Sequence, residues 1–145
     1  MSMKIKVKRF DKSLPLPEYK TRGSACMDLV AGQDTTIAPR QIGYIPLNVA
    51  IEPPVNCWVL LAARSSLHKI GLLPANGIGI GDSDFKGDND EYKLIVYNFT
   101  DSTVSVEKGT RVAQILLVNY EKIEIEETDT LNNSDRGGIG STGLK

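Results

Sequence analysis

The chain has 145 residues, of which 41% are hydrophobic and 24% charged, and its formal net charge is −1. This composition fits one globular domain, and the nearly balanced charge predicts neither nucleic-acid binding nor attraction to a membrane surface. We expect no signal peptide or membrane-spanning helix, because no apolar run approaches the ~18 residues that a spanning helix needs. The two cysteines, Cys26 and Cys57, follow no metal-binding or disulfide spacing, so we expect a reduced, intracellular protein in the cytoplasm.

Short apolar or alternating runs, separated by glycine and proline, make up most of the chain. Many of these runs are rich in Val, Ile and Tyr, which predicts an all-β sandwich or barrel. Examples of these runs, in chain order, are residues 5–7, 41–51, 58–62, 93–97, 103–106 and 112–120. Only residues 65–70 look helical, and that segment is barely two turns long.

The end of the chain has a different character from the rest. Residues 131–145 are rich in glycine and cannot bury a core, so we expect a β-domain over 1–130 and a mobile arm over 131–145. Arg136, Ser141 and Thr142 bring a guanidinium, two hydroxyls and exposed backbone N–H groups, the chemistry of a phosphate clamp. Taken alone, the same tail also fits a disordered end.

Two internal stretches contain groups suited to phosphate chemistry. Arg64, Ser65 and Ser66 fall where a strand gives way to the short helix, and free N–H groups beside a cation suit an oxyanion. Asp82 could act as a base that deprotonates water. Asp82 and Asp84 have no histidine near them in the sequence that could complete a metal site. Each stretch alone also fits a plain serine cap or a polar turn.

Taken together and in order, five stretches resemble the five motifs of the trimeric deoxyuridine triphosphatase (dUTPase) family. They are residues 24–31, 63–71, 76–87, 109–114 and 136–143. The resemblance implies a jelly-roll β-barrel with a mobile Gly-rich C-terminal arm, assembled as a homotrimer with active sites between subunits. It also implies hydrolysis of dUTP to dUMP and pyrophosphate, with Mg²⁺ bound to the triphosphate.

The resemblance further implies roles for individual residues. Asp82 matches the carboxylate that orders the attacking water and contacts the deoxyribose 3′-hydroxyl, and Phe85 replaces the tyrosine that packs under the sugar. Asp28 matches the carboxylate that supports the metal through water. The other matched positions are the uracil-reading hairpin at Asn76, Ile80 and Lys93, the phosphate contacts at Arg64, Ser65, Ser66 and Gln114, and the closing arm at Arg136, Ile139, Gly140, Ser141 and Thr142.

Three departures from the family pattern stand out. Ile139 takes the place of the aromatic residue that stacks on uracil in a shortened fifth motif, which removes a contact of ~1–3 kcal/mol. The segment 88–92 is about three residues longer than usual, and we expect it to bulge the uracil-reading hairpin. Gly81 stands where a larger apolar side chain usually precedes the aspartate.

Two alternatives to a dUTPase remain open from the sequence. Ser66 within Arg-Ser-Ser-Leu also resembles dCTP deaminases, which share the fold, but Ile95 stands where those enzymes have their catalytic glutamate. The departures at Gly81, Ile139 and the insertion would also fit a trimer that binds nucleotide with little or no turnover.

Overall fold

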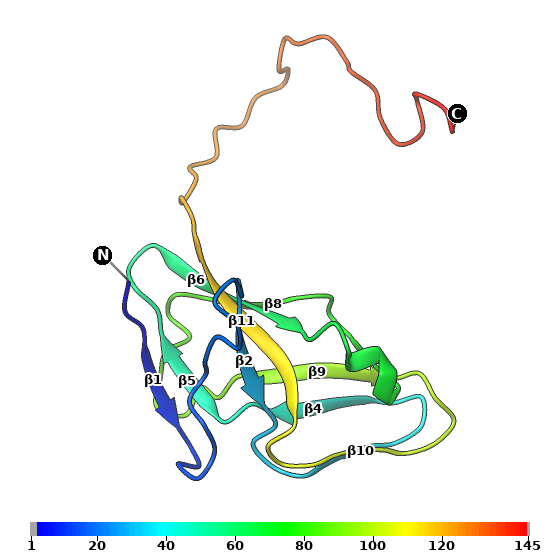
Figure 1. Ribbon diagram of the computed structural model, residues 1–145. Helices are drawn as coiled ribbons and strands as arrows, with labels where there is room; N and C mark the ends of the chain where they lie inside the picture. The colour runs from blue at the N-terminus through cyan, green and yellow to red at the C-terminus, as the bar shows by residue number, and fades with distance from the viewer. Residues whose placement is uncertain (1–2, 145) are drawn as a thin grey trace.

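The computed structural model describes residues 3–144 and shows a β-domain from which the C-terminal segment extends (Figure 1). Among the described residues the regular elements are eleven short strands and one turn of 3₁₀ helix, so the all-β prediction is confirmed. None of the described helical structure is long or apolar enough to cross a membrane. The strands are β1 (Lys6–Arg9), β2 (Met27–Val30), β3 (Thr35–Ile37), β4 (Ile42–Pro46), β5 (Val49–Glu52), β6 (Cys57–Ala63), β7 (Leu72–Pro74), β8 (Gly79–Gly81), β9 (Lys93–Asn98), β10 (Val104–Val106) and β11 (Arg111–Asn119).

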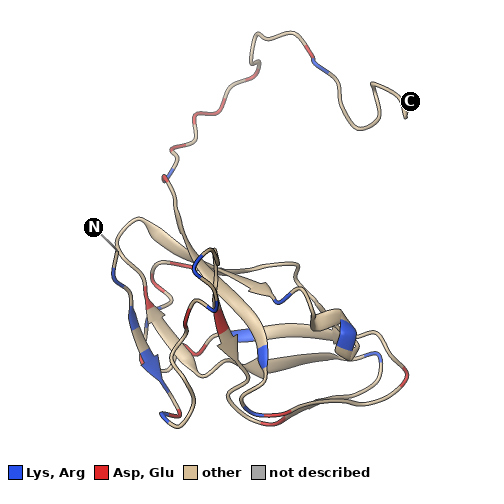
Figure 2. Cartoon of the chain, in the orientation of Figure 1, with Lys and Arg blue, Asp and Glu red and all other residues tan. Residues whose placement is uncertain are grey.

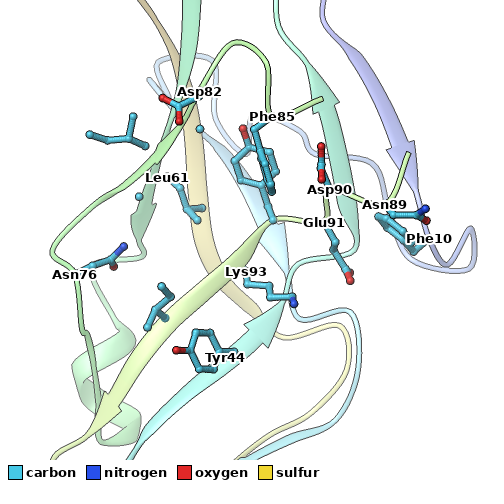
Figure 3. A pocket seen from close by; sticks show the side chains of 15 residues that line it. Phe10, Tyr44, Leu61, Asn76, Asp82, Phe85, Asn89, Asp90, Glu91 and Lys93 are labelled. Carbon is cyan, nitrogen blue, oxygen red and sulfur yellow. The ribbon is translucent and has the colours of Figure 1, made fainter. Parts of the chain in front are cut away.

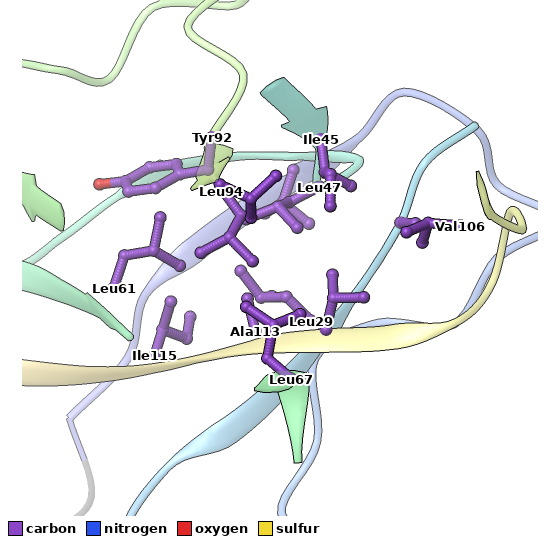
Figure 4. Packing of buried hydrophobic residues seen from close by; sticks show 14 of the residues in the cluster. Leu29, Ile45, Leu47, Leu61, Leu67, Tyr92, Leu94, Val106, Ala113 and Ile115 are labelled. Atoms are coloured by element: carbon purple, nitrogen blue, oxygen red, sulfur yellow. The ribbon is translucent and has the colours of Figure 1, made fainter. Parts of the chain in front are cut away.

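The strands pair antiparallel in four groups. The two larger sheets have the orders β2-β11-β6-β8 and β4-β9-β7, and the strand pairs β1-β5 and β10-β3 complete the domain. Alternating positions of β6 and β9 are buried, as expected for strands with one face against a core. The core is aliphatic with Tyr92 at its edge, and Figure 4 shows how its members pack.

The predicted strand over residues 41–51 is wrong as a single strand, because Asn48 divides it into β4 and β5. Asn48 has a left-handed backbone with φ of 68°, which takes the chain out of the strand conformation. Its buried amide accepts a hydrogen bond from the Asp11 N–H at 2.7 Å and donates one to the Asp11 carbonyl at 3.0 Å. The chain can therefore change sheets at this point: β4 pairs with β9, and β5 pairs with β1.

The predicted helix over residues 65–70 is also shorter than expected. Only Leu67–Ile70 is helical, as a single 3₁₀ turn, and Ser66 at its N-cap makes no side-chain capping bond. Such a short helix offers little dipole to an anion, so any anion binding here depends on Arg64 and the serine hydroxyls themselves.

The segment after β11 lies apart from the core. Every described residue from Glu121 to Leu144 is exposed, and no strand includes them. Figure 2 shows acidic residues spaced along the first part of this segment, before the glycine-rich end. The last residue of the predicted arm, Lys145, lies outside the described residues.

Asn48→Ala tests whether this residue fixes the change of sheet. The variant loses both side-chain bonds to Asp11 and keeps an unfavourable positive φ, so we expect a loss of ~3 kcal/mol in the free energy of unfolding. Asn56 also has positive φ (62°) but an exposed side chain, so Asn56→Ala should lose only ~1 kcal/mol. Urea unfolding measures both, and equal losses would contradict the role assigned to the Asn48 amide.

Candidate active site

Strand β6 separates the predicted site residues into two clusters. β8 pairs with β6 at Val59 to Leu61, so Asp82, which follows β8, lies near the Trp58 end. Arg64 follows the opposite end of β6, where Ala62 lies across from Gln114 of β11. The six residue steps from Trp58 to Arg64 correspond to ~20 Å at ~3.3 Å per strand residue. Within one chain, therefore, Asp82 and Arg64 do not meet.

The first cluster lines a pocket of about 600 Å³, called the Asp82 pocket below. It lies where β8 and β9 diverge, and Figure 3 shows Asp82 and Asn76 on one side and Asp90 and Glu91 on the other. The pocket brings together the predicted nucleoside-contacting residues, which come from β8, β9 and the loops next to them. They are Asn76, Ile80, Asp82, Phe85 and Lys93.

The expected hairpin around this pocket is open. Gly79–Gly81 pairs with β6, whereas β9 pairs with β4 and β7, and no pairing joins β8 to β9 among the described residues. β8 is consequently an edge strand, with one row of its backbone N–H and C=O groups not used by β6. Since β8 lines the pocket, these groups are available to the polar edge of a ligand.

A tight turn positions the two side chains at the mouth of the pocket. The Phe85 N–H donates to the Asp82 carbonyl at 3.0 Å, which closes the turn just after β8 and leaves the Asp82 side chain exposed. The Phe85 ring meets the Tyr92 ring edge-on, with centroids 5.3 Å apart and planes at 76°. Phe85 is thus supported from the core side, while 37% of its surface is exposed and the residue lines the pocket.

The second cluster, called the Asp28 cluster, joins β2, β6 and β11. Arg111 Nη1 donates to Asp28 Oδ2 at 3.0 Å, and Arg64 Nε lies 3.7 Å from the same oxygen. Gln114 Nε2 donates to the Ala63 carbonyl at 3.0 Å, and Arg64 Nη1 donates to the Arg111 carbonyl at 3.2 Å. Two guanidinium groups face one carboxylate, so the cluster keeps a net positive charge that suits an anion. Ser65 and Ser66 directly follow Arg64.

The arm residues join neither cluster in the structure. Arg136, Ile139 and Thr142 are exposed on the segment that extends from the domain (Figure 1). Gly140 and Ser141 belong to turns of the arm itself, closed by bonds such as Ser141 N–H to the Gly138 carbonyl at 3.2 Å.

Two residues at the site had no role assigned to them from the sequence. Arg111 faces Asp28 because a β-bulge shifts the register between Arg111 and Ala113, and the bulge leaves no mark in the sequence. Tyr92 lines the Asp82 pocket at the end of the inserted segment, and its contact with Phe85 joins residues that sequence spacing does not connect.

The described residues include no group of three or more His, Cys, Asp or Glu side chains arranged to hold a metal ion. Asp28 is the carboxylate beside the cationic groups, and it is already engaged by Arg111 and Arg64. These residues fit Mg²⁺ only as an ion that keeps several waters and takes its other ligands from a bound phosphate chain.

Comparison with known proteins agrees with this architecture. The family model described as dUTPase matches residues 12–143. The deoxyuridine 5′-triphosphate nucleotidohydrolase of Rickettsia prowazekii is 38% identical over 148 residues, which cover 98% of each of the two chains. That of Rickettsia akari is 40% identical over 146 residues, which cover 97% of each chain. A solved mutant dUTPase of Staphylococcus bacteriophage 80alpha with dUpNHpp superposes with a TM-score of 0.84 at 19% identity, covering 97% of this chain and 99% of that one. The chain belongs to the dUTPase family, and its fold is the dUTPase-like jelly roll that its five motifs predict.

Proposed function

We propose that the chain hydrolyses dUTP to dUMP and pyrophosphate, with the Asp82 pocket holding the nucleoside and the Asp28 cluster holding the triphosphate. The observation that carries this proposal is the separation of two chemically different clusters. One offers a carboxylate, an aromatic floor and a free strand edge, and the other offers two arginines. A nucleotide has the same division, with a neutral base and sugar at one end and a polyanion at the other.

Asp82 is the base in this proposal. Its exposed carboxylate accepts a proton from a water molecule as the water oxygen attacks the α-phosphorus. The P–O bond to the β-phosphate breaks, so pyrophosphate leaves and dUMP remains. Phe85 lies under the deoxyribose, and its ring leaves too little room for a 2′-hydroxyl. The β8 edge, with Asn76, Ile80 and Lys93 around it, receives the uracil.

The phosphate-binding half of each site comes from another copy of the chain. Because ~20 Å of β6 separates Asp82 from Arg64, one chain cannot place both on one nucleotide. A homotrimer resolves this by setting the Asp28 cluster of one subunit against the Asp82 pocket of the next. Arg64, Ser65, Ser66 and Gln114 then contact the phosphates.

Asp28 would hold a Mg²⁺ ion through water, and such an ion would supply positive charge to the triphosphate. The same carboxylate keeps Arg111 and Arg64 oriented. Residues 131–145 act as an arm that closes over the nucleotide, where Arg136, Gly140, Ser141 and Thr142 meet the γ-phosphate and Ile139 covers the base. Closure excludes water from the reacting groups.

The pocket also favours this function over the deaminase alternative. Ile95 lines the Asp82 pocket and offers no proton acceptor at the position where deamination of cytosine would need one. A nucleotide substrate and two free thiols fit a cytoplasmic enzyme without nucleic-acid or membrane partners.

Asp82→Asn tests the assignment of the base. The amide keeps the size of the side chain but cannot take the proton, so we expect kcat for pyrophosphate release to fall at least 10³-fold, a loss within the order of magnitude expected for a general base. Binding of a non-hydrolysable dUTP analogue should change less than threefold. Asp84→Asn is the matched control and should retain wild-type kcat. Near-normal turnover in Asp82→Asn would remove Asp82 from this role.

Mixing two inactive variants tests the shared site. Arg64→Ala and Asp82→Asn homotrimers should each be inactive, the first from lost phosphate binding and the second from the lost base. Co-refolding them should restore activity, because some sites combine an intact Arg64 from one subunit with an intact Asp82 from another. Mixtures assembled separately and combined without refolding are the control. No recovery after refolding, with mixed trimers demonstrated by mass spectrometry, would place both groups in one subunit.

Deletion of residues 135–145 tests the arm. The described part of the deleted segment, residues 135–144, is exposed and outside the core. The melting temperature and the oligomeric mass should therefore stay unchanged while kcat/KM for dUTP falls at least 100-fold. Size-exclusion chromatography with light scattering and a pyrophosphate assay measure the two effects. Full activity in the truncated protein would contradict closure by the arm.

A further inference from the structure

The turn that carries Asp82 lies mostly outside the packed part of the domain. It follows β8 and closes where the Phe85 N–H donates to the Asp82 carbonyl, with Ser83 and Asp84 at its centre. Of these four residues, Ser83 alone is half-buried, and the other three are exposed. An exposed turn gains little stability from burial, so its order depends on the few contacts that reach it from elsewhere in the chain.

A pair of hydroxyl groups supplies one such contact. Among the residues that the structure describes, a single hydrogen bond joins 82–86 to another part of the chain: Ser83 Oγ and Tyr120 Oη lie 3.1 Å apart, and either hydroxyl can donate. Ser83 and Tyr120 line a second pocket of about 520 Å³, which shares Ile80 and Asp82 with the Asp82 pocket. The hydroxyl pair therefore lies beside Asp82 but outside the pocket proposed for the nucleoside.

Tyr120 is itself held by the longest strand pairing of the domain. The pairing of β11 with β6 ends at Asn119 opposite Cys57, and Tyr120 follows directly. The Tyr120 N–H donates to the Asn56 carbonyl at 3.1 Å, which extends the contact between the two segments by one residue. The Cys57 thiol also donates to Asn119 Oδ1 at 3.2 Å. The sheet thus fixes the Tyr120 backbone, and its hydroxyl offers Ser83 a fixed partner.

The other end of the turn is held independently, through Tyr92. Phe85 meets the Tyr92 ring edge-on, and Tyr92 is 4% exposed at the edge of the core. A Cβ atom added to Gly81 would lie 2.7 Å from Tyr92 Cζ and closer still to the hydroxyl oxygen, so only glycine fits directly before Asp82. Loss of the Ser83 contact would therefore loosen the turn next to Asp82 while Phe85 kept its support.

We propose that Tyr120 is a positioning residue for Asp82: its hydroxyl holds Ser83, and through Ser83 it holds the turn that directs the Asp82 carboxylate toward the attacking water. Tyr120 does not line the nucleoside pocket and acts through the backbone of the turn. A general base must keep its oxygen within hydrogen-bond reach of the water, so a small displacement lowers the rate with little effect on binding. This inference rests on the proposed role of Asp82 as the base.

Tyr120→Phe and Ser83→Ala each remove one hydroxyl of the pair. We expect kcat for pyrophosphate release from dUTP to fall ~10-fold in both, because the base is less well placed, with KM changed less than twofold. The melting temperature should fall by only a few degrees, as for one partly exposed hydrogen bond. Wild-type kcat in both variants would overturn the positioning role.

Two further variants act as controls for these substitutions. Ser83→Thr keeps a hydroxyl at the same position and should retain most of the wild-type kcat, which a general sensitivity of the turn to substitution would not allow. Tyr19→Phe makes the matched change on an exposed tyrosine outside both clusters and should leave kcat unchanged. A loss in Ser83→Thr as large as that in Ser83→Ala would contradict a role for the hydroxyl.

The double variant Ser83→Ala/Tyr120→Phe separates one shared bond from two unrelated effects. If the two hydroxyls act through each other, kcat of the double variant stays ~10-fold below wild type, as in each single variant. Independent effects would multiply to a loss of ~100-fold, and that result would rule out the proposed pairing.

Amide hydrogen exchange of Phe85 gives a measurement that does not depend on turnover. The Phe85 N–H closes the turn, so its exchange should become several-fold faster in Tyr120→Phe, and unchanged exchange would count against the inference. A wild-type protein that releases no pyrophosphate from dUTP would overturn the proposed function, while this exchange would still show whether Tyr120 holds the turn. An active wild type with fully active Tyr120→Phe and Ser83→Ala variants would overturn the positioning role alone.

Discussion

The antiparallel pairing of β6 with β11 is the constraint on which the arrangement of the site depends. It runs from Ala63 opposite Ala113 to Cys57 opposite Asn119, and β2 and β8 are added on either side of it. A hydrogen-bonded ladder of this length does not bend enough to bring its ends together. The distance between the Asp82 pocket and the Asp28 cluster is therefore fixed by the sheet. That fixed distance is the reason why the proposed function shares each site between subunits.

The sheet also separates the charges. Asp82, Asp90 and Glu91 line the pocket at one end, and Arg64 and Arg111 share Asp28 at the other. The acidic end can receive hydroxyls, amide N–H groups and water, but it would repel a triphosphate. The cationic end attracts phosphate, and its internal carboxylate keeps the two arginines together before any ligand arrives. This difference in charge is consistent with the orientation that the proposed function gives to the nucleotide.

The sequence predicts the strands and the grouping of motifs well where local pattern decides the structure. β6, β9 and β11 follow from their runs of Val, Ile and Leu, and their observed ends differ from the expected ends by at most one residue. The break at Asn48, the bulge before Ala113 and the gap between β8 and β9 depend on partners distant in the chain. Local pattern cannot supply those partners, so the contacts of Arg111 with Asp28 and of Tyr92 with Phe85 become visible only in three dimensions.

The shared space of Gly81 and Tyr92 also limits how this protein can change over generations. A larger residue at position 81 collides with the hydroxyl unless Tyr92 has been lost first, and loss of Tyr92 first leaves a hole in the edge of the core. Both single steps are unfavourable, although the doubly changed chain can pack well. The two positions are expected to be inherited as a pair, so that a descendant with a bulky residue at 81 also carries a smaller side chain at 92.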